Sequence, residues 1–136
     1  MIIFRGEDLV YIIIVNYNGS DDTIECINSL LKITYKKFKI VVVDNNSRKS
    51  ELEKIKNLDK EFTLISLNNN LGFAKANNIG IKYAIKQGAD YCLLLNNDTT
   101  VDENFLGILV ESLKKNSKAG IATGLILNYY NHNEKW

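Results

Sequence analysis

The sequence predicts an α/β fold: a doubly wound three-layer sandwich around a mainly parallel sheet. Apolar runs of strand length alternate along the chain with segments whose apolar residues recur at helical spacing. The runs are rich in Val and Ile and show little polar alternation, which is typical of strands covered on both faces. The resulting order, βαβ(α)βαβαβ, favours parallel strands joined by right-handed helical crossovers.

Five apolar runs are expected to form the strands. They cover 9–17, 38–44, 62–67, 91–95 and 120–127. The longest apolar run, "VYIIIV" at 10–15, is far shorter than the roughly 20 residues that a membrane-spanning helix needs. The first residues, "MIIFRGED", lack a basic leader and a cleavage site. We therefore expect no transmembrane segment. The expected location is the cytoplasm, either free or at the inner face of the cell membrane.

Two helices are expected before the third strand. Asp21 and Asp22 stand where the dipole of a first helix favours acids. Ser50 and Glu53 have the spacing of a capping box for a short second helix. The residues expected to face inward are Ile24, Ile27, Leu30 and Leu31 in the first helix, and Leu52 and Ile55 in the second.

Two further helices are expected at about 73–87 and 102–115. The third ends at Gly88, a good stop signal. Asn78 falls on its expected inner face, so its amide should be satisfied within the fold and support the shape of the site. The inward residues are Ala74, Asn78, Ile81 and Ile85 in the third helix, and Phe105, Leu109 and Leu113 in the fourth.

Composition indicates one globular domain with a small partner. The 136 residues are 46% apolar, enough for one core, and the net charge of +1 gives no reason to expect nucleic acid. We expect a single domain at 1–136, with its core at about 9–127 and a loose tail at 128–136. Two cysteines and one histidine exclude a thiolate zinc site and a disulfide framework, and we expect both cysteines to be buried free thiols.

Short polar residues follow four of the expected strands. In open parallel sheets, ligands bind beyond the carboxyl ends of the strands, so these residues should share one edge. Asn and Asp are also ordinary turn formers, so a single cluster would carry little weight. The clusters are Asn16, Tyr17, Asn18 and Gly19; Asp44, Asn45, Asn46 and Ser47; Asn68, Asn69, Asn70 and Gly72; and Asn96, Asn97 and Asp98.

Four segments, in this order, carry a resemblance to a known family: "IIIVNYNG", "IVVVDNNS", "NNNLGFAKANNIGI" and "YCLLLNNDTTV". Over residues 10–127 the sequence resembles the inverting nucleotide-sugar glycosyltransferases of family 2, which have the GT-A fold. The third segment is similar to the family's N-x-G-[FY]-x-x-A-x-N-x-G-I signature, and the fourth occupies the place of its D-x-D strand end. Among family members, it looks most like rhamnosyltransferases that build bacterial surface polysaccharides.

The resemblance implies a donor-binding site. Asp44 would meet the base, and Asn16 and Tyr17 would flank it; the alternative for Asp44 is a turn with Ser47. The helix dipole disfavours a cation such as Lys75 in the first turn of the third helix, so a phosphate or sugar ligand explains this residue better than solvent does. The implied donor-binding residues are Asn16, Tyr17, Asp44, Asn46, Gly72, Lys75, Asn96, Asn97 and Asp98.

Asp98 is the implied metal ligand. A Mn²⁺ or Mg²⁺ ion that bridges two phosphates needs only one or two protein carboxylates. Asn96 replaces the first acid of the D-x-D pattern, which leaves Asp98 as the one carboxylate of this segment. The alternative is that "NND" is only a turn that caps the fourth helix.

The resemblance also implies the reaction. A sugar would move from a UDP- or dTDP-sugar to a hydroxyl of a glycan or lipid-linked acceptor, which requires a general base. In the family that carboxylate lies well after the D-x-D strand, so we expect it beyond Trp136 and expect the fold to be incomplete at its C-terminus. The alternative is a nucleotide-sugar-binding domain without catalysis.

Overall fold

Four parallel strands form the sheet of the computed structural model, which describes residues 8–135. The strands are β1 (Val10–Asn16), β2 (Phe38–Asp44), β3 (Thr63–Ser66) and β4 (Tyr91–Asn96), in the order β3-β2-β1-β4. Asn16 stands opposite Asp44, and Val15 opposite Asn96. The strands therefore end together, and the predicted parallel sheet is confirmed.

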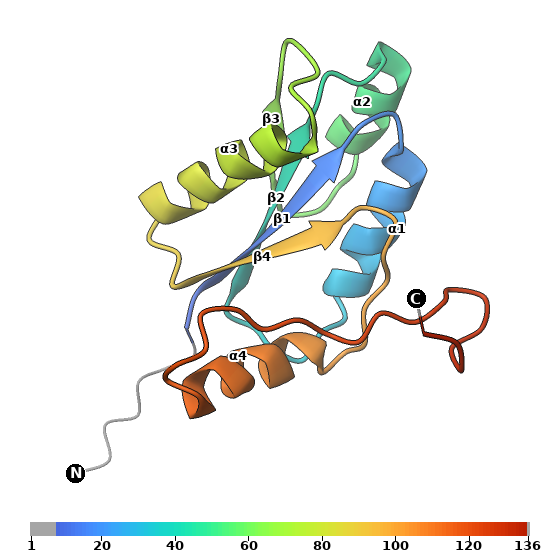
Figure 1. Ribbon diagram of the computed structural model, residues 1–136. Coiled ribbons are helices and arrows are strands. Elements are labelled where there is room, and N and C mark those ends of the chain that lie inside the picture. The colour runs from blue at the N-terminus through green and yellow to red at the C-terminus, as the bar shows by residue number, and fades with distance from the viewer. Residues whose placement is uncertain (1–7, 136) are drawn as a thin grey trace.

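Helices cover both faces of the sheet (Figure 1). The helices are α1 (Ser20–Leu30), α2 (Lys49–Lys56), α3 (Phe73–Lys86) and α4 (Phe105–Lys115). Ile12 and Ile14 of β1 belong to a core with α1, α2 and α4, whereas Tyr11 and Ile13 belong to a core with α3. This alternation confirms the three-layer sandwich. Among the described helices, none is long and apolar enough to cross a membrane.

The expected fifth strand at 120–127 is wrong. This stretch is irregular, and its one β-type contact is an isolated antiparallel bridge between Leu127 and Lys135. Ile121 is 88% exposed. An apolar run becomes a strand only where a neighbouring strand accepts its backbone hydrogen bonds. Within residues 8–135 no strand pairs with this run. Met1 to Glu7 and Trp136, which belong to the expected domain, lie outside the described residues.

The expected inner face of α3 is wrong in part: Ile81 packs against the core, but the other three expected residues do not. Its buried residues are Ala76, Asn77, Gly80 and Ala84, whereas Ala74, Asn78 and Ile85 are exposed. A Cβ on Gly80 would lie 2.5 Å from Cγ2 of Ile13 and 3.3 Å from Cγ2 of Val43. The helix backbone thus packs directly onto β-branched side chains of the sheet. Small residues permit this close approach. A helical pattern of large apolar residues therefore does not identify the face of α3 that packs on the sheet.

The α2 capping box is not formed. Arg48 is the N-cap of α2, no side chain caps it, and Ser50 lies inside the helix. The next residue, Glu51, instead accepts hydrogen bonds from the backbone N–H and the hydroxyl of Ser20 at the start of α1. The hydroxyl bond is the main reason why the pKa of Glu51 is lowered. An acid of one helix therefore caps the neighbouring helix.

Replacing Glu51 with Gln should destabilise the protein at neutral pH and have less effect in acid. The pKa of Glu51 is lower in the folded chain than its ordinary value of 4.5, so its stabilising contribution is present above that value. It is lost as the pH falls through the folded pKa. Thermal melting of both proteins at pH 7 and at lower pH measures the effect.

Glu53→Gln is the matched control, because Glu53 lies on the same helix and pairs with Lys56 at the surface. It should shift the melting temperature less than Glu51→Gln does at pH 7. Equal shifts at every pH would show that the contact between Glu51 and Ser20 adds nothing.

Candidate functional site

The strand order reverses between β1 and β4. The chain moves outward from β1 to β2 and β3, and α3 then returns it to the other side of β1. A crevice beyond the carboxyl ends of the strands is expected at such a switch point. Polar residues follow both β1 and β4 here.

A hollow of about 330 Å³ opens at this point. Such a volume lies at the lower end of the range for small-molecule sites. Tyr17 and Phe73 are 52% and 60% exposed, so aromatic surface is available to a planar ligand. The lining residues are Val15, Tyr17, Asn45, Asn70, Gly72, Phe73, Asn96 and Asn97.

Asn45 and Asn70 tie the loop before α3 to the end of β2. The Asn45 amide donates to the Asn70 side-chain oxygen at 2.8 Å, and its own oxygen accepts from the Leu71 N–H at 2.9 Å. The Gly72 N–H donates to Asn70 at 2.9 Å, and Gly72 has a left-handed φ of 81°. These bonds set the wall of the hollow.

The implied donor-binding residues did not include four residues of the lining: Val15, Asn45, Asn70 and Phe73. Asn45 and Asn70 were within the polar clusters that follow the strands, and Phe73 was within the family signature. Their position was therefore visible in the sequence. Which of several neighbouring asparagines faces the hollow was not.

Asn16 and Asp44 lie behind this wall, at 0% and 1% exposure. Asn16 Nδ2 donates to Asp44 Oδ1 at 2.7 Å and to Ser47 Oγ at 3.0 Å. Asp44 Oδ2 accepts from the Ser47 N–H at 3.0 Å, so the turn that was the alternative for Asp44 is formed. Both carboxylate oxygens thus have donors inside the fold, and contact of Asp44 with a base stays a prediction.

Three other expected site residues lie at the surface outside the lining. Asn46 is exposed and has a left-handed φ of 68°. Lys75 is exposed in the first turn of α3. Asn78 is exposed as well, so the expectation that its amide is hydrogen-bonded inside the fold is wrong. Its neighbour Asn77 is buried, and its amide donates to the Phe73 carbonyl at 3.1 Å.

The turn after β4 points its side chains in different directions. Asn96 is exposed, whereas Asn97 Nδ2 donates to the Gly19 carbonyl at 3.2 Å and to Thr23 Oγ1 at 3.1 Å. Asp98 is exposed. Burial, and after it the charge of Asp98, raises the pKa of the Cys26 thiol to about 12. Asp98 therefore lies near α1, and Cys26 stays protonated at neutral pH.

The expectation for the cysteines holds in part. Cys26 and Cys92 are both free thiols, but only Cys26 is buried, and Cys92 is exposed. Among the described residues, no three His, Cys, Asp or Glu side chains are grouped so that they could hold a metal. A cation at Asp98 would need most of its ligands from elsewhere.

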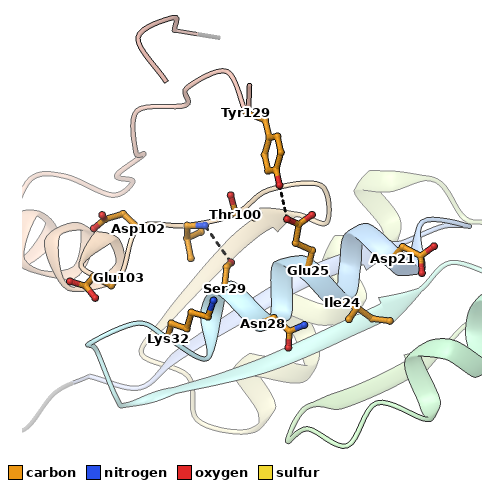
Figure 2. Close-up of a pocket in the computed structure, with 11 residues that line it drawn as sticks. Asp21, Ile24, Glu25, Asn28, Ser29, Lys32, Thr100, Asp102, Glu103 and Tyr129 are labelled. Atoms are coloured by element: carbon orange, nitrogen blue, oxygen red, sulfur yellow. Dashed lines mark hydrogen bonds between the residues drawn. The ribbon is translucent and has the colours of Figure 1, made fainter. Parts of the chain in front are cut away.

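A larger hollow, of about 700 Å³, lies beside α1 (Figure 2). Its lining includes four carboxylates, those of Asp21, Glu25, Asp102 and Glu103, and one cation, Lys32. Tyr129 extends over it and donates to Glu25 at 2.6 Å. This excess of negative charge disfavours a diphosphate. The smaller hollow at the switch point is therefore the candidate site for a nucleotide.

Comparison with known proteins places the chain in a family. The model of glycosyl transferase family 2 matches residues 11–136. The chain belongs to this family. As a family 2 chain it is 32% identical over 110 residues to the poly-β-1,6-N-acetyl-D-glucosamine synthases of Staphylococcus aureus and Staphylococcus epidermidis. The match covers 79% of this chain and 26% of each synthase, so the chain spans about a quarter of these relatives' length.

Solved structures show the same fold. The mannosyltransferase PcManGT from Pyrobaculum calidifontis, in complex with GDP-Man and Mn²⁺, has a TM-score of 0.70 at 20% identity. The match covers 80% of the family 2 chain and 33% of PcManGT. S. aureus TarS in complex with UDP-GlcNAc has a TM-score of 0.68 at 20% identity, over 87% and 38% of the two chains. The expected GT-A fold is confirmed.

Proposed function

We propose that this chain is a nucleotide-sugar-binding domain of a glycosyltransferase in bacterial cell-surface polysaccharide synthesis. The reaction would move a sugar from a nucleoside diphosphate sugar to an acceptor hydroxyl. The observation that carries the proposal is the hollow at the switch point, with its asparagine lining and two exposed aromatic rings. Family membership supports the same proposal.

The lining matches the chemistry of a nucleoside. A base offers a flat ring and hydrogen-bonding edges, and Tyr17 and Phe73 offer ring faces at the rim. The amides of Asn45, Asn70 and Asn96 supply donors and acceptors for a base, ribose or sugar. We propose a UDP- or dTDP-sugar as the donor and a glycan or lipid-linked acceptor, with no nucleic acid as partner.

The residues also fit a divalent cation that is shared with the donor. We propose Mn²⁺ or Mg²⁺, held by Asp98 and by phosphate oxygens, because Asp98 carries an exposed carboxylate in the turn after β4. When bound, the cation would stabilise negative charge on the leaving diphosphate. Lys75 and the first N–H groups of α3 would add positive potential for the phosphates.

We place this function in the cytoplasm or at the inner face of the cell membrane. The two free thiols, one of them exposed, suit a reducing compartment.

Asp98→Asn should abolish the metal's effect on nucleotide binding and leave the fold intact. Phosphates and protein must both supply ligands, so Mn²⁺ should tighten UDP, dTDP or GDP binding by about 5- to 150-fold in the parent. Without the carboxylate this enhancement should approach one. Calorimetric titration of each diphosphate with and without Mn²⁺ measures it.

Asp59→Asn is the control, because it makes the same charge change at an exposed loop position after α2. It should keep the parent's metal dependence. A parent protein that binds none of the diphosphates would overturn the proposed nucleotide site. Diphosphate binding that is independent of metal would leave the site in place and remove Asp98 as the metal ligand.

One observation favours binding without transfer as a second candidate function. The described lining of the hollow contains no carboxylate and no imidazole that could take the acceptor's proton. Incubation with UDP-GlcNAc and added glycan separates the two functions. Release of UDP indicates transfer, whereas tight binding without release indicates binding alone.

A further inference from the structure

Thr23 carries a polar group in the interior of the fold that no motif identified. It lies in α1, it is fully buried, and it faces the ends of the strands. Its Oγ1 is 2.9 Å from Asn16 Oδ1, 2.9 Å from the Gly19 carbonyl and 3.1 Å from Asn97 Nδ2. The hydroxyl therefore stands between the end of β1 and the turn after β4.

The direction of these hydrogen bonds can be assigned. Asn16 uses Nδ2 to donate to Asp44 and Ser47, so its oxygen must accept. Thr23 has one hydroxyl hydrogen, and the Gly19 carbonyl already accepts from the Thr23 N–H at 3.0 Å. The Thr23 hydroxyl therefore donates its hydrogen to buried Asn16 Oδ1 and accepts a hydrogen bond from Asn97 Nδ2.

These contacts form one continuous chain of donors and acceptors. It runs from the Asn97 amide to the Thr23 hydroxyl, then through the Asn16 amide to the Asp44 carboxylate. It crosses from the turn of Asp98 to the end of β2, where Asp44 is predicted to meet the base. The packing is tight, since a Cβ on Gly19 would lie 2.9 Å from Asn97 Nδ2.

We propose that Thr23 is a positioning residue that couples the nucleoside side of the site to the phosphate side. This inference rests on the proposed function. By orienting Asn97 and Asn16 at once, the hydroxyl holds the turn of Asp98 in register with the end of β2. Loss of the hydroxyl leaves Asn97 Nδ2 with only the longer bond to the Gly19 carbonyl and leaves Asn16 Oδ1 without this donor.

Thr23→Val, which has the same shape without the hydroxyl, should reduce the enhancement of UDP binding by Mn²⁺ at least about fivefold. The affinity for uridine, which carries no phosphate, should change less. Thr23→Ser should restore the enhancement because it keeps the hydroxyl. Calorimetry with UDP, uridine and Mn²⁺ gives all three values, and a Thr23→Val protein with the parent's enhancement would overturn the inference.

If Thr23→Val does not fold, Asn97→Ala serves the same test, because it removes the donor and leaves the buried hydroxyl in place. It should lose the Mn²⁺ enhancement as well. An Asn97→Ala protein with an unchanged enhancement contradicts the coupling.

A measurement without ligand separates this inference from the proposed function. In heteronuclear NMR spectra, Thr23→Val should shift the Asn97 side-chain amide and the backbone signals of Asp44 and Ser47 together. Ser29→Ala is the matched control: its hydroxyl lies in the same helix but bonds to Cys26 and Val101. Unmoved signals at either end in Thr23→Val would refute the coupling, whereas a parent that binds no diphosphate would refute only the proposed function.

Discussion

Replacing Asn16 with Asp should lower the free energy of unfolding at pH 7 by about 3–5 kcal/mol, the cost typical of an uncompensated buried charge. The change keeps the shape of the side chain but exchanges the donating amide for an oxygen. That oxygen would lie where Asn16 Nδ2 now stands, 2.7 Å from Asp44 Oδ1. Two carboxylates would then face each other at a fully buried position. Denaturant unfolding of the two proteins gives the difference.

Asn78→Asp is the control, because it makes the same chemical change at an exposed position of α3. Its effect should stay within about 0.5 kcal/mol, as is usual for surface substitutions. If both variants were equally stable, the buried hydrogen bond between Asn16 and Asp44 would not exist in solution.

Gly80→Ala should destabilise the protein although alanine is the better helix former. The new Cβ would lie 2.5 Å from Ile13 Cγ2, and Ile13 is fully buried in the sheet. Overpacking of this kind costs about 1–3 kcal/mol, and the gain in helix propensity is about 1 kcal/mol. A net loss of up to about 2 kcal/mol is therefore expected in denaturant unfolding.

Gly107→Ala should have the opposite sign. Gly107 also lies in a helix, α4, but its added Cβ would meet Tyr35 at 3.9 Å, an ordinary contact. The propensity gain then remains, and the variant should be more stable by up to about 1 kcal/mol. If Gly80→Ala were as stabilising as Gly107→Ala, α3 would not pack on the sheet as closely as described.

Local sequence determined the four strands and the location of the candidate site. Val-rich and Ile-rich runs such as "IVVVD" can be satisfied only by burial on both faces, so β1 and β2 follow from composition and length. The polar residues directly after these runs must then share the carboxyl edge of the sheet. The family signature fixed the same edge independently, since it lies around the loop that enters α3.

Tertiary structure decided what a local pattern does not contain. The run at 120–127 has the composition of a strand, but a strand needs a partner, and within the described residues it has none. The inner face of α3 was set by how closely Gly80 approaches Ile13, which favours small residues over large apolar ones. Tertiary packing also decided which asparagines are buried. Asn77 is buried and Asn78 next to it is exposed, just as Asn16 is buried at the end of β1. Burial depends on how each helix or strand is rotated against its neighbours, and composition does not specify that rotation.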